Sequence, residues 1–209
     1  NMKKIPYISF ALLSFVLLVA CSNKDSEFFN EVTIQVPNQL VIDTQSSYTT
    51  QDTLWMHTAF SRYLPEENFS NLLDVYQSSG QAAGFQFAFI LEKKATNGMW
   101  EFYALSANLI EELGDVQEND GYYTGLSVYN ETAKTYDFRS GLKLTEAGEY
   151  RINFGYESLI NRAVILRSLS QANNLVVNIR STVQALDASG YYLFTVNLLP
   201  VNLRFLVSS

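Results

Sequence analysis

The stretch LTEAGEYRINF, residues 144–154, indicates the fold more clearly than any other part of the chain. Tyr150, Ile152 and Phe154 occupy alternate positions, and a side-chain period of two is typical of a β-strand with one buried face. Ala147 and Gly148 stand just before this run, where small residues mark a turn. The stretch therefore predicts a turn followed by a strand over residues 149–155.

The same alternation recurs through most of the chain. The dipeptide Asn97–Gly98 favours a tight turn, so residues 84–93 and 99–106 are predicted to form a hairpin. Further strands are predicted near residues 32–36, 54–60, 123–130, 134–144, 162–168, 175–184 and 191–204. Many short strands separated by turns favour an antiparallel sandwich over a parallel α/β sheet.

One segment, residues 65–80 (PEENFSNLLDVYQSSG), favours a helix. Its apolar residues Phe69, Leu72, Leu73 and Tyr76 are spaced i, i+3, i+4 and i+7, and Gly80 follows them. We expect a short helical insertion between two strands.

The turn before residue 149 resembles the tyrosine corner of immunoglobulin-like domains, with Glu146, Gly148 and Tyr150 at the matching positions. The resemblance implies an all-β, antiparallel immunoglobulin-like β-sandwich, enlarged, in which the Tyr150 hydroxyl bonds back to the turn. Ile152 stands where antibody domains carry cysteine, so the resemblance is to the broad fold.

A looser copy of the same pattern occurs at Asp187, Gly190 and Tyr192. Two copies are consistent with two small sandwiches or with one enlarged one. Because no Pro-rich or Ser-rich linker interrupts residues 156–190, we expect a single domain over residues 31–209.

The first twenty residues have the layout of a secretory signal. Lys3 and Lys4 precede a run of about fifteen mostly apolar residues, which is short for a membrane span of roughly 20. The run ends in Leu18, Val19, Ala20 and Cys21, which resemble the bacterial lipobox. That resemblance implies cleavage between Ala20 and Cys21 and acylation of Cys21, the only cysteine. An ordinary secretory signal or an uncleaved anchor is the alternative.

Residues 21–30 would then be an acylated cysteine and a short polar tether. Lys24, Asp25 and Glu27 resemble the charged export signals of surface lipoproteins of the Bacteroidota type. The resemblance implies the outer face of the outer membrane as the location, with its periplasmic face as the alternative.

Composition narrows the range of partners. Without residues 1–20, which hold two lysines and no acid, the chain carries 12 basic and 21 acidic residues, a net charge of −9. Nucleic acid is therefore not expected as a partner, because phosphate binding needs clustered Lys and Arg. The membrane, through the lipid, and a glycan or envelope protein are the expected partners.

Aromatic residues are the candidate ligand contacts. Tyr122, Tyr123 and Trp100 are the candidate binding residues, since Tyr and Trp combine large contact area with a polar group. Tyr129 and Tyr136 belong to the same set. The alternative is that a chain with 14% aromatic residues uses its rings to fill the core.

No catalytic residue, metal site or cofactor is predicted, and we expect a protein that is not an enzyme. His57 is the only histidine, and its alternation with core positions favours a structural role. The acidic segment EELGDVQENDG, residues 111–121, is expected to be a solvated loop; calcium binding and a glycosidase carboxylate pair are its alternatives.

The sequence thus predicts a lipid-anchored, non-catalytic envelope lipoprotein that binds a glycan, a peptide or another protein. A small hydrolase that uses carboxylates is one alternative. A pilin-like subunit is another, because the last stretch, residues 192–209, is long and apolar enough to exchange between subunits.

Overall fold

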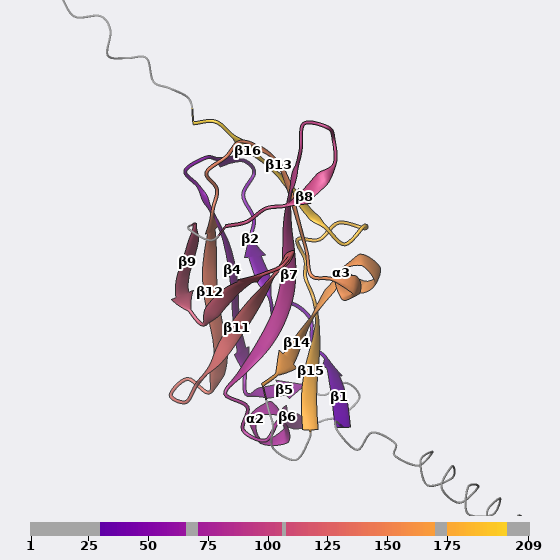
Figure 1. Cartoon of the computed structure of the whole chain (residues 1–209). Coiled ribbons are helices and arrows are strands. Elements are labelled where there is room, and N and C mark those ends of the chain that lie inside the picture. The colour runs from indigo at the N-terminus through magenta and orange to yellow at the C-terminus, as the bar shows by residue number, and fades with distance from the viewer. Residues whose placement is uncertain (1–29, 66–70, 106–107, 170–174, 200–209) are drawn as a thin grey trace, which may run out of the picture. The chain divides into compact units, whose positions relative to one another are not determined.

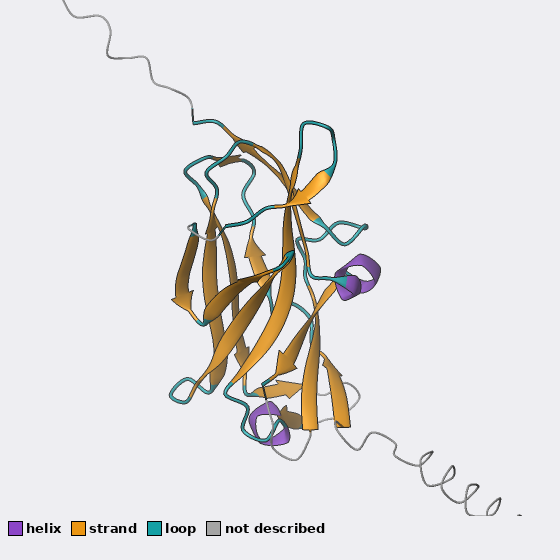
Figure 2. Cartoon of the chain, in the orientation of Figure 1, coloured by secondary structure: helices purple, strands orange, loops and turns teal. Residues whose placement is uncertain are grey.

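The computed structural model describes residues 30–65, 71–105, 108–169 and 175–199, which are mostly β-strand with two short helices (Figures 1 and 2). The all-β prediction is confirmed for these residues. The elements are β1 (Asn30–Gln35), β2 (Val41–Asp43), β3 (Tyr48–Thr49), β4 (Thr53–Ser61), β5 (Tyr63–Pro65), β6 (Leu72–Asp74), α2 (Val75–Ser78), β7 (Gly84–Lys94), β8 (Trp100–Phe102), β9 (Leu109–Leu113), β10 (Asp115–Asn119), β11 (Tyr122–Asn130), β12 (Thr135–Lys143), β13 (Gly148–Asn153), α3 (Tyr156–Asn161), β14 (Ala163–Ser168), β15 (Leu175–Thr182) and β16 (Tyr192–Asn197).

Strand β7 organises the sheet, which follows the order β1-β15-β14-β7-β11-β12-β4-β2. The first half of β7 pairs with β11 and β14, and its second half pairs with β13 and β8. The pairing of Glu92 with Phe102 confirms the predicted hairpin. Because the two halves of β7 pair with different strands, the sheet curls, and one of its faces is turned inward (Figure 1).

The sheet is mixed, which corrects the prediction of a purely antiparallel one. Strands β3 and β16 run parallel, with Val196 opposite Tyr48 and Asn197 opposite Thr49. At the end of β1 the N–H groups of Val36 and Asn38 donate to the carbonyls of Arg180 and Thr182, a rising register that is also parallel. Side-chain alternation reports which face is buried, but not the direction of a distant partner strand.

The acidic segment is not a loop. Gly114, with a φ of +77°, joins β9 to β10, and a Cβ there would lie 2.1 Å from the Leu126 carbonyl oxygen. Strand β9 pairs with β12 and β10 pairs with β11, so the two strands fill the gap where β11 and β12 diverge. Four of the five side chains of β9 are exposed, which removes the alternation that would have predicted it.

The predicted helix over residues 65–80 is largely wrong within the described residues. Leu72 and Leu73 belong to β6 and pair with Pro65 and Leu64, and only α2, four residues long, is helical. Phe69 lies outside the described residues. The pairing of β6 with β5 therefore outweighs the helical spacing of the apolar residues. A second helix, α3, was not predicted from the sequence and begins after Gly155.

The predicted corner is present. The Tyr150 hydroxyl donates to the Glu146 carbonyl at 2.8 Å, across the turn that enters β13. The looser second copy is not a corner, because the Tyr192 hydroxyl lies 3.1 Å from the Tyr48 hydroxyl instead of bonding its own turn. That turn is closed by the Asp187 carboxylate, which accepts from the N–H groups of Ser189 and Tyr191.

One core fills the body. The described residues from Glu31 onward form one compact unit around a single cluster of buried hydrophobic side chains. Rings dominate this cluster and meet edge-on or stacked, as for Phe87 against Phe138 and Phe89 against Tyr123. Each buried tyrosine hydroxyl finds an acceptor, as when Tyr136 donates to Ala82. Most of the aromatic content therefore serves packing.

Candidate functional site

The residues predicted for lipid attachment lie outside the described part of the chain. Ala20 and Cys21 belong to the predicted signal and its cleavage point, whereas the described residues begin at Asn30. Across the described ranges, no helix is long and apolar enough to cross a membrane.

Two of the predicted ligand contacts lie side by side in β11 but face opposite ways. Tyr122 is exposed, whereas Tyr123 is fully buried. The Tyr123 hydroxyl accepts from the Leu105 N–H and donates to the Tyr103 carbonyl, both at 2.7 Å. Burial raises the pKa of Tyr123 well above its ordinary value. The prediction that Tyr123 contacts a ligand is therefore corrected: it is a core residue.

Trp100 is half-buried and already has a partner. The Arg151 guanidinium lies 4.5 Å from the centre of the Trp100 ring and 4.3 Å from that of Tyr191. Glu92 holds the same guanidinium with two bonds, of 2.5 and 3.0 Å. Trp100 thus forms part of a ladder across β8, β7 and β13, with at least one face of its ring occupied.

Tyr122 and Trp100 do not form one platform. Tyr123, next to Tyr122, lies opposite Phe89 of β7, whereas Trp100 lies opposite Lys94. Five residues along a strand correspond to roughly 17 Å. Of the predicted set, Tyr136 is also a core residue and Tyr129 is partly buried against the core.

Three carboxylates of the acidic segment each bind a different partner. Glu111 accepts from the Val116 N–H at 2.8 Å, and Glu112 accepts from Arg139 Nε at 2.6 Å. Glu118 accepts from the Leu105 N–H at 3.0 Å. In the part of the chain that the structure describes, no three His, Cys, Asp or Glu side chains gather as a metal site would require. These carboxylates therefore hold β9 and β10 in place.

His57 lies on the outer face of β4, beside an aromatic and ionic cluster. Its Nδ1 lies 3.2 Å from Asp43 Oδ1 but is buried without a hydrogen-bond partner. The Arg139 guanidinium lies 4.5 Å from the centre of the neighbouring Trp55 ring. Arg139 is also 3.7 Å from Asp43. These contacts connect β2, β4 and β12, which agrees with the structural role expected for His57.

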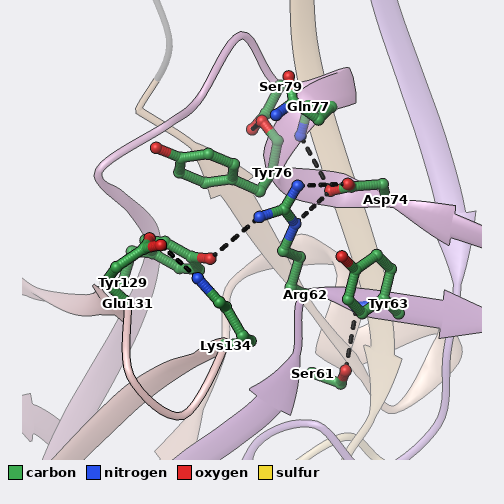
Figure 3. A network of polar contacts seen from close by, with 10 residues as sticks. All are labelled: Ser61, Arg62, Tyr63, Asp74, Tyr76, Gln77, Ser79, Tyr129, Glu131 and Lys134. Carbon is green, nitrogen blue, oxygen red and sulfur yellow. Dashed lines mark hydrogen bonds and ion pairs between the residues drawn. The ribbon is translucent and has the colours of Figure 1, made fainter.

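Each guanidinium nitrogen of Arg62 donates a hydrogen bond (Figure 3). Its Nε and Nη2 donate to the two oxygens of Asp74 at 2.8 and 2.6 Å, and Nη1 donates to the Tyr129 hydroxyl at 3.4 Å. The rings of Tyr63 and Tyr76 lie 5.2 and 4.8 Å from the guanidinium carbon. Arg62 therefore joins β5, β6, α2 and β11 and has little capacity left for a ligand.

One cavity of the described structure was not predicted from the sequence. It has a volume of about 620 Å³ and lies where the ends of β1, β5, α3 and β15 meet. Its apolar lining comes from Val36, Pro37, Pro65 and Ala163. Its polar lining comes from Gln35, Asn161, Arg180 and Thr182.

Among the described residues of that lining, Arg180 is the only charged one, and its hydrogen-bond donors are only partly used. Its Nη2 donates to Glu157 at 3.1 Å, and its Nε is buried without a hydrogen-bond partner. A buried donor left unpaired costs about 1–3 kcal/mol. Arg180 thus differs from Arg62 and Arg151, each of which forms two bonds to a carboxylate and lies over two aromatic rings.

Helix α3 borders this cavity, since its last residue, Asn161, is part of the lining. Tyr156, Leu159 and Ile160 of α3 are 76, 42 and 56% exposed. Their i, i+3 and i+4 spacing puts them on one face of the helix. No signal in the sequence joins α3 to the cavity, because the lining segments lie far apart in the chain.

Comparisons of this chain with models of known protein families, with curated proteins and with solved structures found no match.

Proposed function

We propose that this chain is a lipid-anchored lipoprotein of the cell envelope, whose immunoglobulin-like β-sandwich binds a partner without catalysing a reaction. The lipobox-like run ending in Cys21 supports the anchor, and the bond from Tyr150 to Glu146 supports the likeness to immunoglobulin-like domains. The outer face of the outer membrane is the proposed location.

The observation that carries the binding function is the cavity beside α3. It combines an apolar lining, a few polar groups and an arginine with unused donors, which is the usual composition of a binding site. The acidic side chains that would serve a hydrolase are instead bonded to backbone or to arginine. Binding therefore fits the described residues better than hydrolysis does.

The anchor is tested by changing Cys21→Ala in the full chain and labelling growing cells with an alkyne analogue of palmitate. The wild-type protein should be labelled and should sediment with membranes, whereas the variant should be unlabelled and released. Ser26→Ala is the matched control and should behave as wild type. Equal labelling of the wild type and the Cys21→Ala variant would show that Cys21 is not the site of acylation.

The location is tested separately by adding protease to intact cells. Loss of the protein without cell lysis places it on the outer face, whereas loss only after lysis places it on the periplasmic face.

Any hydrolytic turnover that disappears in Glu111→Gln would favour the hydrolase over the binding protein.

A further inference from the structure

On the basis of the proposed binding function, we infer that the cavity and the exposed face of α3 form a docking site for an extended, uncharged segment of a partner protein. The site consists of Arg180, Asn161, Pro37 and Pro65, which line the cavity, together with the exposed Tyr156 and Ile160 of α3, the helix whose last residue, Asn161, belongs to that lining.

The lining favours a peptide over a sugar. Pro37, Pro65, Val36 and Ala163 offer small aliphatic surfaces that suit an apolar side chain. No aromatic ring is among the described residues that line the cavity, and Tyr156 of α3 is not part of that lining, so these residues offer a sugar no flat face inside the cavity on which to stack. The amides of Gln35 and Asn161 and the Thr182 hydroxyl can donate and accept, as a peptide backbone requires.

The charge balance favours an uncharged segment. Glu157 lies 3.1 Å from Arg180 Nη2, so the two charges balance and the site has no net charge that would attract a charged ligand, while each of them still repels a like charge placed next to it. A carboxylate on the ligand would meet the repulsion of Glu157, and a lysine would meet that of Arg180. Peptide carbonyls avoid both costs, and they supply the acceptors that the remaining N–H groups of Arg180 need.

The backbone beside the cavity favours an extended partner. Strand β1 ends the strand order, with β15 as its neighbour. Val36 and Asn38 donate toward β15, and because successive strand residues alternate, the N–H and C=O of Gln35 point to the opposite edge, where no strand of the described residues pairs with β1. An extended segment can add to such an edge while its side chains enter a neighbouring pocket.

The apolar face of α3 favours a protein over a small molecule. Tyr156, Leu159 and Ile160 are exposed, although hydrogen bonds tie the first turn of α3 to the residues before it. The Ser158 hydroxyl accepts from the Phe154 N–H and donates to the Gly155 carbonyl, both at 2.9 Å. Exposed aromatic and aliphatic side chains on a fixed element are typical of protein-binding surfaces.

The test uses the full acylated chain in lipid nanodiscs, with ¹⁵N-labelled arginine. The probe is a pool of short N-acetylated, C-amidated peptides built from Ala, Val, Leu, Pro, Ser and Thr. The Nε–H resonance of Arg180 should shift as the pool is added, and the resonance of Arg167 should not. Pools containing Asp or Lys, and a chito-oligosaccharide, should give much smaller shifts.

Two pairs of variants locate the binding. Arg180→Lys and Ile160→Ser should each weaken binding of the uncharged pool by about tenfold, which corresponds to about 1.4 kcal/mol. Arg167→Lys and Leu193→Ser are the controls, because Arg167 pairs with Glu31 outside the cavity and Leu193 is exposed on β16. Thermal melting of each variant shows that it is folded.

Three results would overturn the docking site: no shift with the uncharged pool, a larger shift with the oligosaccharide or a charged pool, or equal binding by Arg180→Lys and wild type. None of them would affect palmitate labelling at Cys21. Failure of the docking site is therefore distinguishable from failure of the anchored lipoprotein.

Discussion

The Tyr150 hydroxyl donates a 2.8 Å hydrogen bond to the carbonyl oxygen of Glu146, four residues earlier in the chain. The Tyr150 ring also stacks on Phe194 of β16, with ring centres 5.5 Å apart. One fully buried side chain thus closes the turn into β13 and fixes the strand beside it. Burial raises the pKa of Tyr150 well above the ordinary range, so the hydroxyl remains a donor in any physiological medium.

Changing Tyr150→Phe should lower the free energy of unfolding by about 1 kcal/mol, because the ring stays and the Glu146 carbonyl loses its donor. Urea unfolding followed by circular dichroism measures the change. Tyr122→Phe, at an exposed position in β11, should be neutral and serves as the control. Equal stability of the Tyr150→Phe variant and wild type would mean that the corner bond adds nothing.

The two glycines at positions 98 and 190 give a matched test of the contact between the 187–191 turn and α3. Both have a left-handed backbone, with φ of +84° and +81°. A Cβ at Gly98 meets nothing within 4 Å, whereas a Cβ at Gly190 would lie 2.1 Å from the Ser158 carbonyl oxygen.

We therefore expect Gly98→Ala to cost about 1 kcal/mol, which is the left-handed strain alone. Gly190→Ala should cost about 3 kcal/mol or more, because α3 or the turn must also move. Urea unfolding of the two variants measures the difference. A difference under about 0.5 kcal/mol would show that the turn does not press on α3 in solution.

The corner can be predicted from the sequence because it is local: its donor and acceptor lie within five residues, and Gly148 marks the turn. Strands such as β4 and β12 can be predicted because one buried face imposes a period of two. Strand β9 cannot, since most of its side chains are exposed and its place depends on the divergence of β11 and β12.

The candidate site is less predictable than the fold. Tyr122 and Tyr123 look equivalent in the sequence, and only the pairing of Tyr123 with Phe89 decides which of them enters the core. Arg180 gives no local signal, because its cavity forms from segments near residues 36, 65 and 161. Helix α3 is too short, and its apolar residues too exposed, for a buried-face pattern to reveal it.

Acid should weaken the network around Arg62. Its paired bonds lower the pKa of Asp74, so the ionised carboxylate stabilises the folded state above the pKa that Asp has in an unfolded chain, about 4. This stabilisation is lost as the pH falls through the lower folded-state pKa. Arg62→Lys should lower the melting temperature by several degrees at neutral pH, because lysine cannot grip both oxygens.

Melting temperatures between about pH 6 and pH 2.5 test this dependence on Asp74. Asp74→Asn should start lower than wild type and should fall less steeply with acid, so the two curves converge. Asp120→Asn, at an exposed turn, should follow wild type throughout. Parallel curves for wild type and Asp74→Asn would show that Asp74 is not coupled to folding.

Alkali should unfold the protein through its buried phenols. Burial raises the pKa values of Tyr48, Tyr123, Tyr136 and Tyr150 well above the ordinary value. The unfolded chain therefore loses phenolic protons above about pH 10 that the folded chain keeps. Stability is complete below that pH and falls as the pH rises above it.

Absorbance at 295 nm, recorded alongside circular dichroism, tests this expectation. The four buried tyrosines should ionise only as the strand signal disappears, so their absorbance change should coincide with unfolding. Tyr136→Phe should reduce the part of the absorbance change that coincides with unfolding. If every tyrosine ionised near pH 10 in the folded protein, the four phenols would be open to solvent, and the ring-filled core would not describe the protein in solution.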